Sequence, residues 1–291
     1  MGEKKLKAAV VLSGCGHLDG AEVREAVLSL LVLDQQDVDV KCFAPDINIT
    51  QVMNHKTKEA VKEKRNVLVE AARIARGEIY DLKGAKAENF DMLVVSGGYG
   101  VAKNLSDLSE NKDMVTVMPE FERLVSEFSV TKKPIGAICI SPAIIVSILS
   151  SKIGKEESKV KVTIGDDREQ LIEKLGGEHI KCDTGLSIED EEHNVFSCSA
   201  YMRSDESIYS VYQGIKHMID SMIDTQGLPH AIHITTAEAT DRSSAVKMVK
   251  NAKANLSEVK NILVDAGYTG ENFATQIKKT IVATVEVIKQ K

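Results

Sequence analysis

The chain has 291 residues, 43% of them hydrophobic, which allows one large domain or two modest ones with a substantial core. A net charge of −6 without a basic stripe argues against nucleic-acid binding. The five scattered cysteines form no CxxC pair, which argues against a disulfide framework or a zinc site. No run approaches the ~20 apolar residues of a membrane span, and the N-terminal apolar run is too short for a secretory signal, so we expect a cytoplasmic protein.

Short β-branched apolar runs alternate with amphipathic segments along the first 225 residues. The helix over 22–33 has apolar residues at helical spacing, and we expect its buried face to be Val23, Ala26, Val27, Leu30 and Leu31. The predicted strands are 8–12, 38–44, 92–100 (running into a glycine loop), 134–138, 159–164, HIKC and NVFSCS. The predicted helices are 22–33, 66–76 with Gly77 as C-cap, 119–128, one from Ser141, 166–176 and 205–224.

This alternation predicts an α/β fold with a mainly parallel sheet covered by helices on both faces. In such sheets the functional loops lie at the carboxyl ends of the strands. Three loops qualify: 13–20, 96–104 and 139–142.

The pattern changes after residue 228, where a polar stretch with Pro229 resembles a linker. Residues 242–265 and 271–289 have helical apolar spacing and are separated by Gly267 and Gly270, which predicts a helical hairpin. We therefore expect two domains, 1–228 and 229–291. The hairpin is too small to bury its apolar stripe alone, so it needs the main domain or another subunit.

The run PIGAICISPAII over 134–145 is the strongest local signal for chemistry. A short apolar strand ends at Cys139, and a helix begins at Ser141 and Pro142 after one sharp turn. Backbone N–H groups at a helix start favour an anion, and a cysteine placed there tends towards the nucleophilic thiolate. The alternative is a small buried apolar residue at a strand end, as for most free cysteines.

Six segments in order carry a family resemblance: SGCGHLDGAEVREAVLSLL, CFAPD, NHKTKEAVKEKRNVLVEAARIARGEI, GGYGVAKNLSDL, CISPA and KVTIGDD. Over roughly residues 6–225 the chain resembles the ElbB family, glyoxalase-like proteins with an amidotransferase-like domain in the PfpI/deglycase superfamily. The resemblance implies a flavodoxin-like sheet with Cys139 at a nucleophile elbow. It says nothing about residues 229–291.

The resemblance also implies that Glu22 points its carboxyl group at the Cys139 sulfur and shuttles protons. The N–H groups of Gly98 and Ile140 would form the oxyanion hole. The alternatives are a simple first-turn charge for Glu22 and a turn requiring positive φ for Gly97 and Gly98. For Gly97 and Gly98, both interpretations can hold together.

Three further residues are candidates for the pocket. Cys15 and His17 lie in the first glycine loop, and His179 lies on the later predicted strand HIKC. The alternatives are a small loop-filling residue for Cys15 and an exposed loop histidine for His17. Wider relatives carry a histidine where this chain has Gly165, and no His-x-Glu occurs around FSCSAYM. We therefore do not expect glutaminase activity, and we expect neither a metal nor a cofactor.

The resemblance implies cofactor-independent conversion of glyoxal or methylglyoxal to a hydroxy acid through Cys139 and Glu22. The alternative is a non-catalytic redox sensor or an accessory protein linked to isoprenoid metabolism, with Cys139 as an oxidisable thiol. A homodimer is expected because the superfamily often forms dimers.

Overall fold

The computed structural model describes residues 5–112, 114–152 and 158–225, and in the C-terminal part residues 261–264, 275, 278–279 and 284–287. By its contacts the chain forms two compact units, Met1–Leu228 and Pro229–Lys291, and each is described by itself. Among the described helices, none is long and apolar enough to cross a membrane.

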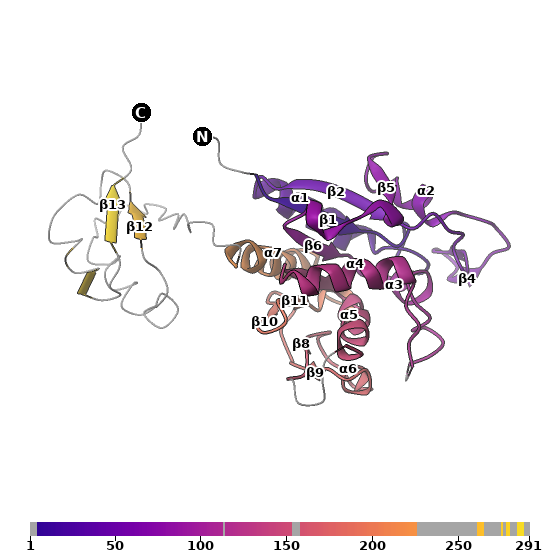
Figure 1. The fold of residues 1–291 in the computed structure, drawn as a ribbon. Helices are drawn as coiled ribbons and strands as arrows, with labels where there is room; N and C mark the ends of the chain where they lie inside the picture. Colours follow the sequence, from indigo (N-terminus) through magenta and orange to yellow (C-terminus); the bar gives the residue numbers. More distant parts are fainter. Residues whose placement is uncertain are drawn as a thin grey trace. The chain divides into compact units, whose positions relative to one another are not determined.

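The first unit is built on a seven-stranded sheet with the order β10-β11-β7-β6-β1-β2-β5 (Figure 1). Every neighbouring pair is parallel except β10 and β11. This confirms the predicted flavodoxin-like α/β class. The strands are β1 (Lys7–Val11), β2 (Asp39–Ala44), β5 (Ile79–Asp81), β6 (Met92–Val95), β7 (Ile135–Ile138), β10 (Ile188–Asp190) and β11 (Val195–Cys198).

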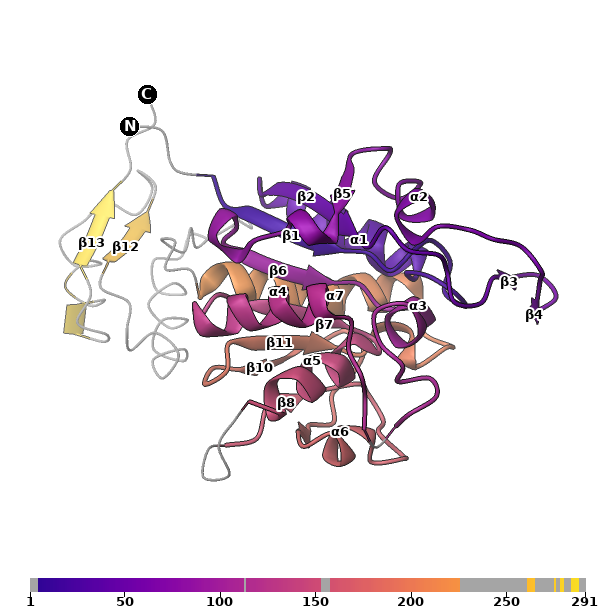
Figure 2. The ribbon, with the colours of Figure 1, turned by 45° about the vertical axis from the view of Figure 1, so that its right-hand side comes forward.

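Helices cover both faces of this sheet, as predicted from buried parallel strands (Figure 2). One face packs on α1 (Val23–Gln35), α2 (Val67–Ala71) and α7 (Ile208–Asp224). The other packs on α3 (Tyr99–Lys103), α4 (Pro119–Val130) and α5 (Ser141–Ser150). Alternate residues of β1 enter the two cores: Ala8 and Val10 enter the first, Ala9 and Val11 the second.

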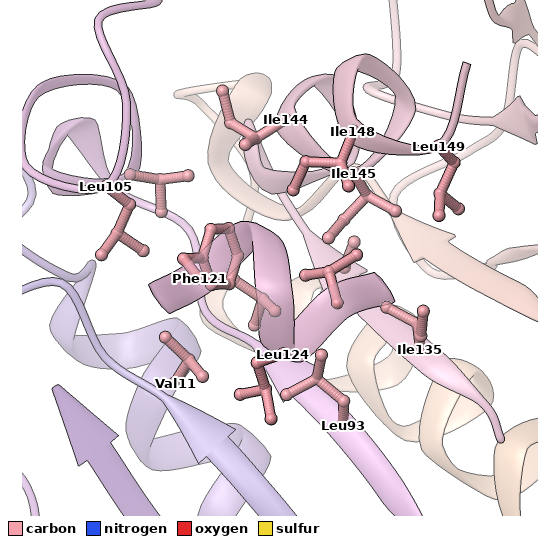
Figure 3. Close-up of a cluster of buried hydrophobic side chains, with 14 of the residues drawn as sticks. Val11, Leu93, Leu105, Phe121, Leu124, Ile135, Ile144, Ile145, Ile148 and Leu149 are labelled. Atoms are coloured by element: carbon pink, nitrogen blue, oxygen red, sulfur yellow. The ribbon is translucent and has the colours of Figure 1, made fainter. Parts of the chain in front are cut away.

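The core under α4 and α5 fixes the position of the turn after β7 (Figure 3). Phe121 of α4 is fully buried, as are Ile144 and Ile145 of α5 and Ile135 of β7. Fully burying one such side chain contributes roughly 1.5–3 kcal/mol. Because α5 is held by its own buried face, the turn that precedes it is held as well.

Several predicted elements are shorter than expected. Helix α6 (Leu171–Lys174) begins late because the Asp167 carboxylate accepts the N–H groups of Leu171 and Ile172, and Gln170 has a left-handed φ of 55°. Helix α2 gives way to turns before Gly77, whose φ is 89° and whose N–H donates to the Ala72 carbonyl.

The predicted strand over 159–164 lies outside the main sheet. Its regular part is β8 (Lys161–Val162), which pairs in parallel with β9 (Glu178–His179), and β10 was not predicted. The remaining elements are the hairpin β3 (Met53–Asn54) and β4 (Glu59–Ala60), and the 3-10 turns η1 (Leu82–Gly84), η2 (Ala87–Asn89) and η3 (Ala200–Met202).

The predicted buried face of α1 is wrong in its phase. Val23, Val27 and Leu31 are 39%, 47% and 43% exposed. The buried residues are Glu25, Ala26, Ser29, Val32 and Leu33. Apolar residues occur on both sides of this helix, so their spacing fits two faces, and only packing decides between them. This difference matters because the buried face of α1 carries the carboxyl group of Glu25.

The predicted C-terminal helices are wrong at residues 261–264 and 284–287, which are strands. β12 (Asn261–Val264) pairs in parallel with β13 (Thr284–Val287), whereas Thr275 and residues 278–279 are helical. Short apolar runs rich in β-branched residues fit a strand as well as a helix segment, so spacing alone misleads here. The rest of both predicted helices and the linker after residue 228 lie outside the described residues.

Candidate active site

Cys139 stands on the sharp turn between β7 and α5, as predicted. Its φ of 63° is unusual for a residue other than glycine, and such strain persists only where surrounding structure enforces it. Its N–H donates to the Cys198 carbonyl at 2.9 Å, and the Ser141 hydroxyl donates to the Ser96 carbonyl at 2.8 Å. These bonds hold the turn on both sides. Cys139 is 8% exposed.

The carboxyl group that interacts with the Cys139 thiol belongs to Glu25. Glu25 is fully buried on α1. Its Oε1 accepts the Tyr201 N–H at 3.2 Å, while its Oε2 makes no well-aligned hydrogen bond to any described residue. The Cys139 thiol and the Gly97 backbone N–H are the groups that act on the carboxyl group from the second loop and the turn after β7.

The predicted contact between Glu22 and Cys139 is wrong in the structure. Glu22 is the N-cap of α1, with extended φ and ψ of −67° and 119°, and its Oε2 accepts the Glu25 N–H at 2.7 Å. An N-cap side chain is held by its own helix in this way, and the carboxyl group that acts on the sulfur is that of Glu25. Glu25 lies one turn further on. A signal for it was available: Glu25 shares helical spacing with Ser29, Val32 and Leu33.

Glu25 makes the ionisation of Cys139 more costly, whereas a hydrogen bond from the Cys139 thiol favours the ionised form of Glu25. Burial, followed by the charge of Glu22, raises the pKa of Glu25 from its usual 4.5 to about 8. Burial, followed by the charge of Glu25, raises the pKa of Cys139 well above its usual range, although the Gly98 and Ile140 N–H groups favour the thiolate. Two adjacent negative charges are unfavourable in a buried site. At neutral pH the acid is therefore protonated, and the pair loses its protons one at a time.

Two glycines allow the second loop to approach this pair. A Cβ on Gly97 would lie 2.3 Å from Glu25 Oε2 and 2.4 Å from Cys139 Cβ. Gly98 has a φ of 97°, and a Cβ there would lie 2.4 Å from the Gly20 carbonyl oxygen. The Glu22 N–H also donates to the Gly97 carbonyl at 3.0 Å, so the first and second loops meet beside Cys139. The structure thus brings the N–H groups of Gly98 and Ile140 to the sulfur.

The other three candidates for the pocket lie in different surroundings from the Glu25–Cys139 pair. Cys15 is half-buried, and its charged neighbours are Glu70, Arg73 and Asp19. His17 is exposed and packs edge-on against His55 at 5.2 Å; burial and then His55 lower its pKa, and the charge of Glu22 opposes this. His179 lies in β9, where its N–H donates to Glu173. The structure brings His17 to the Glu22 side of the site but does not place Cys15 or His179 beside Cys139.

The place of the relatives' histidine is filled differently here. A Cβ on Gly165 would lie 3.0 Å from Ser199 Cβ and 3.5 Å from Arg203 Nε. Arg203 Nε in turn pairs with Asp166 at 3.2 Å. Within residues 5–112, 114–152 and 158–225, no histidine hydrogen-bonds to Cys139, and no group of three His, Cys, Asp or Glu side chains could hold a metal. Glu25 is thus the acid–base group available to Cys139.

Known proteins match most of the first unit. The ES1 protein homologue of mitochondria from Rattus norvegicus is 35% identical over 235 residues, covering 77% of this chain and 85% of the relative. A mitochondrial glutamine amidotransferase-like class 1 domain-containing protein from Homo sapiens is 34% identical, covering 76% and 84%. The crystal structure of an isoprenoid biosynthesis protein with an amidotransferase-like domain from Ehrlichia chaffeensis has 53% identity and a TM-score of 0.71, covering 76% and 99%.

A family model for a transposase DDE domain matches residues 209–287. This match spans less than a third of the chain and crosses the boundary between the two units at Leu228. Its first residues belong to α7, which packs on α1 and on the sheet of the first unit. It therefore does not define the family of the chain.

Gly97→Ala is expected to destabilise the first unit by about 1–3 kcal/mol, because the new methyl group overlaps Glu25 Oε2 and Cys139 Cβ. Urea unfolding would measure this. Gly84→Ala is the matched control, since a Cβ there meets no atom within 4 Å. Equal stability of the two variants would contradict the packing described for Gly97.

Glu25→Gln is expected to gain stability over the wild type as pH rises from about 4.5 to 8. In that window the unfolded chain releases a proton that the folded carboxyl retains, so wild-type stability falls with pH. The free energy of unfolding of Glu25→Gln, measured by urea unfolding, should rise relative to that of the wild type by at most about 5 kcal/mol over this window. Ser29→Ala, on the same buried face, is the control and should differ from wild type by a pH-independent amount. A pH-independent difference for Glu25→Gln would rule out the raised pKa.

Proposed function

The chain belongs to the family of ES1-like proteins with a class I glutamine amidotransferase-like domain, and from this we propose that it converts small α-oxoaldehydes into hydroxy acids. Cys139 is the proposed nucleophile and Glu25 the proposed acid–base group. The observation that carries the proposal is the buried Glu25 carboxyl beside a strained Cys139, with two N–H groups at the same sulfur. No further group is required for the chemistry below.

In the first step the Cys139 thiolate adds to the aldehyde carbon, and a C–S bond forms. The Gly98 and Ile140 N–H groups stabilise the oxyanion, a contribution worth roughly 2.7–4 kcal/mol per donor in other acyl-transfer sites. Protonated Glu25 then gives its proton to the oxygen, which yields a hemithioacetal and a carboxylate. The raised pKa of Glu25 suits this role, because a carboxyl group near neutral pKa can both donate and accept.

In the second step the Glu25 carboxylate removes the proton from the former aldehyde carbon. The electron pair moves into an enediolate, the same proton returns to the neighbouring carbon, and the hydroxyl proton of the first carbon passes to the oxygen of the second. The product is a thioester, in which the first carbon has been oxidised and the second reduced. Water then cleaves the thioester and restores the thiol. Glyoxal plus water thus gives glycolate, with no outside oxidant, and methylglyoxal gives lactate.

Glutaminase chemistry is not proposed. Expelling ammonia from an amide requires a general acid that protonates the leaving nitrogen. Histidine often performs this task. Gly165 and the Arg203–Asp166 pair stand where the superfamily resemblance would lead one to expect a histidine. The 34% identity to a glutamine amidotransferase-like protein supports membership of the family. It does not supply the missing histidine at residue 165.

A link to isoprenoid metabolism is a second proposal, supported only by the description of the 53% identical relative. In this version Cys139 senses oxidants and does not turn over substrate. The raised pKa of the thiol does not separate the two proposals, because the thiolate is both the oxidisable form and the nucleophile. Intact mass after mild peroxide, measured beside the turnover assay, separates the two. An oxidised Cys139 with no α-oxoaldehyde turnover would favour sensing.

Cys139→Ser is expected to lose more than about 1,000-fold in glyoxal turnover, and Glu25→Gln about 100- to 10,000-fold. Glu22→Gln should lose less than about tenfold, since Glu22 caps α1. Purified variants assayed for glycolate would rank these effects. Cys15→Ser is the control thiol and should retain wild-type turnover. A larger loss in Glu22→Gln than in Glu25→Gln would reverse the proposed assignment.

The kcat/KM for glyoxal is expected to rise about tenfold per pH unit up to about pH 8 and then level off. Below that pH the pair holds both protons and has neither a thiolate nor a base. Because the charge of Glu22 helps to raise the pKa of Glu25, Glu22→Gln should move the midpoint to lower pH. A flat profile between pH 6 and 9, or an unmoved midpoint in this variant, would contradict the shared titration.

A further inference from the structure

A cavity of about 1,060 Å³ adjoins the candidate site at Ile140, the residue that follows Cys139. Its walls include Tyr99 and Lys103 of α3, and Met202 and Arg203 of the segment after β11. Cavities of roughly 300–1,000 Å³ hold drug-sized ligands. Glyoxal has only four non-hydrogen atoms and would leave nearly all of this cavity to water. The cavity therefore fits a larger substrate than the smallest α-oxoaldehydes.

Most charged groups of the cavity wall are already occupied. Lys112 pairs with Glu169 at 2.6 Å and Arg203 with Asp166 at 3.2 Å. The acids are engaged as well: Asp167 accepts two backbone N–H groups of α6, and Glu206 accepts the Thr184 hydroxyl at 2.9 Å. Asp167 and Glu206 keep their negative charge, but both carboxylates are engaged in hydrogen bonds within the protein.

Lys103 differs from these groups. Its Nζ donates to the Leu18 carbonyl at 3.3 Å and lies 5.8 Å from the centre of the Tyr99 ring. It is half-buried, and among the described residues no carboxylate pairs with it. A partly desolvated ammonium gains from an anion more than a fully hydrated one does. Lys103 also lies on the helix that begins directly after Gly98, whose N–H points at the Cys139 sulfur.

We propose that Lys103 is a specificity-determining residue that binds an anionic group, a carboxylate or a phosphate, at the far end of a longer α-oxoaldehyde substrate. The aldehyde end reaches Cys139 past Ile140, and the anion pairs with the Lys103 ammonium beside Tyr99. The proposal rests on the proposed function for its substrate class. The anion site itself can be tested without any turnover.

The test compares two five-carbon α-oxoaldehydes, 4,5-dioxovalerate with a terminal carboxylate and neutral 2-oxopentanal. Wild type is expected to favour the carboxylate compound in kcat/KM. Lys103→Met should lower the ratio of the two kcat/KM values about tenfold, mainly through a higher KM for 4,5-dioxovalerate. Inorganic phosphate should compete with 4,5-dioxovalerate more strongly than acetate if the natural group is a phosphate, and less strongly if it is a carboxylate.

Lys112→Met is the matched control, because Lys112 lines the same cavity but already has Glu169 as its partner. Its ratio should equal that of the wild type. An unchanged ratio in Lys103→Met, or an equal fall in both variants, would overturn the inference while leaving the proposed function standing.

A second readout separates failure of the inference from failure of the proposed function. Levulinate carries the carboxylate and a ketone but no aldehyde, and its binding can be measured by calorimetry. Binding that is at least tenfold weaker in Lys103→Met than in Lys112→Met would support the anion site even if no α-oxoaldehyde turned over. Equal binding to both variants would overturn it.

Discussion

The burial of the Glu25 carboxyl group against the Cys139 thiol is the constraint on which the rest of the site depends. A carboxyl group with no exposed surface can be kept only as a neutral acid or with strong donors. The structure supplies the Tyr201 N–H from the far end of the first unit, 176 residues away in sequence. Residue 97 is a glycine, and any Cβ there would collide with both Glu25 and Cys139. The first, second and last loops of the sheet therefore have to close on the same point.

Sequence patterns predicted the frame of this site well. Buried parallel strands give continuous apolar runs, so β1, β6 and β7 and the loops after them followed from composition alone. The turn that carries Cys139 followed from a strand and a helix in series, whereas the two N–H groups near the sulfur were implied by the family resemblance. The Gly165 substitution was likewise visible in sequence, and the structure adds the Arg203–Asp166 pair beside it.

Two predictions for α1 failed: the phase of its buried face, taken from apolar spacing, and Glu22 as the acid beside Cys139, implied by the family resemblance. Glu22 and Glu25 are both acids in the first turns of α1, and either could meet the sulfur if the helix rotated by less than one turn. The rotation is decided by packing of Val32 and Leu33 against the sheet and by the Tyr201 contact, neither of which is local. The same ambiguity affected β12 and β13, where β-branched runs fitted two periods at once. Long-range contacts, absent from any one segment, resolved both cases.

The pairing of a cysteine with a carboxyl group, and not with an imidazole, also limits what the site can do. An imidazole near its usual pKa can leave a cysteine as a thiolate with a cation beside it. A buried carboxyl group instead makes the thiolate cost more whenever the acid is ionised. Such a pair suits a reaction in which one proton travels between neighbouring atoms and returns, because the net charge of the site then stays constant. An internal redox exchange across two adjacent carbons meets that condition, whereas expelling an amine does not. The constant net charge of the Glu25–Cys139 pair during such an exchange is therefore the physical reason for proposing an α-oxoaldehyde substrate, and the Lys103 proposal extends that substrate class by an anionic end.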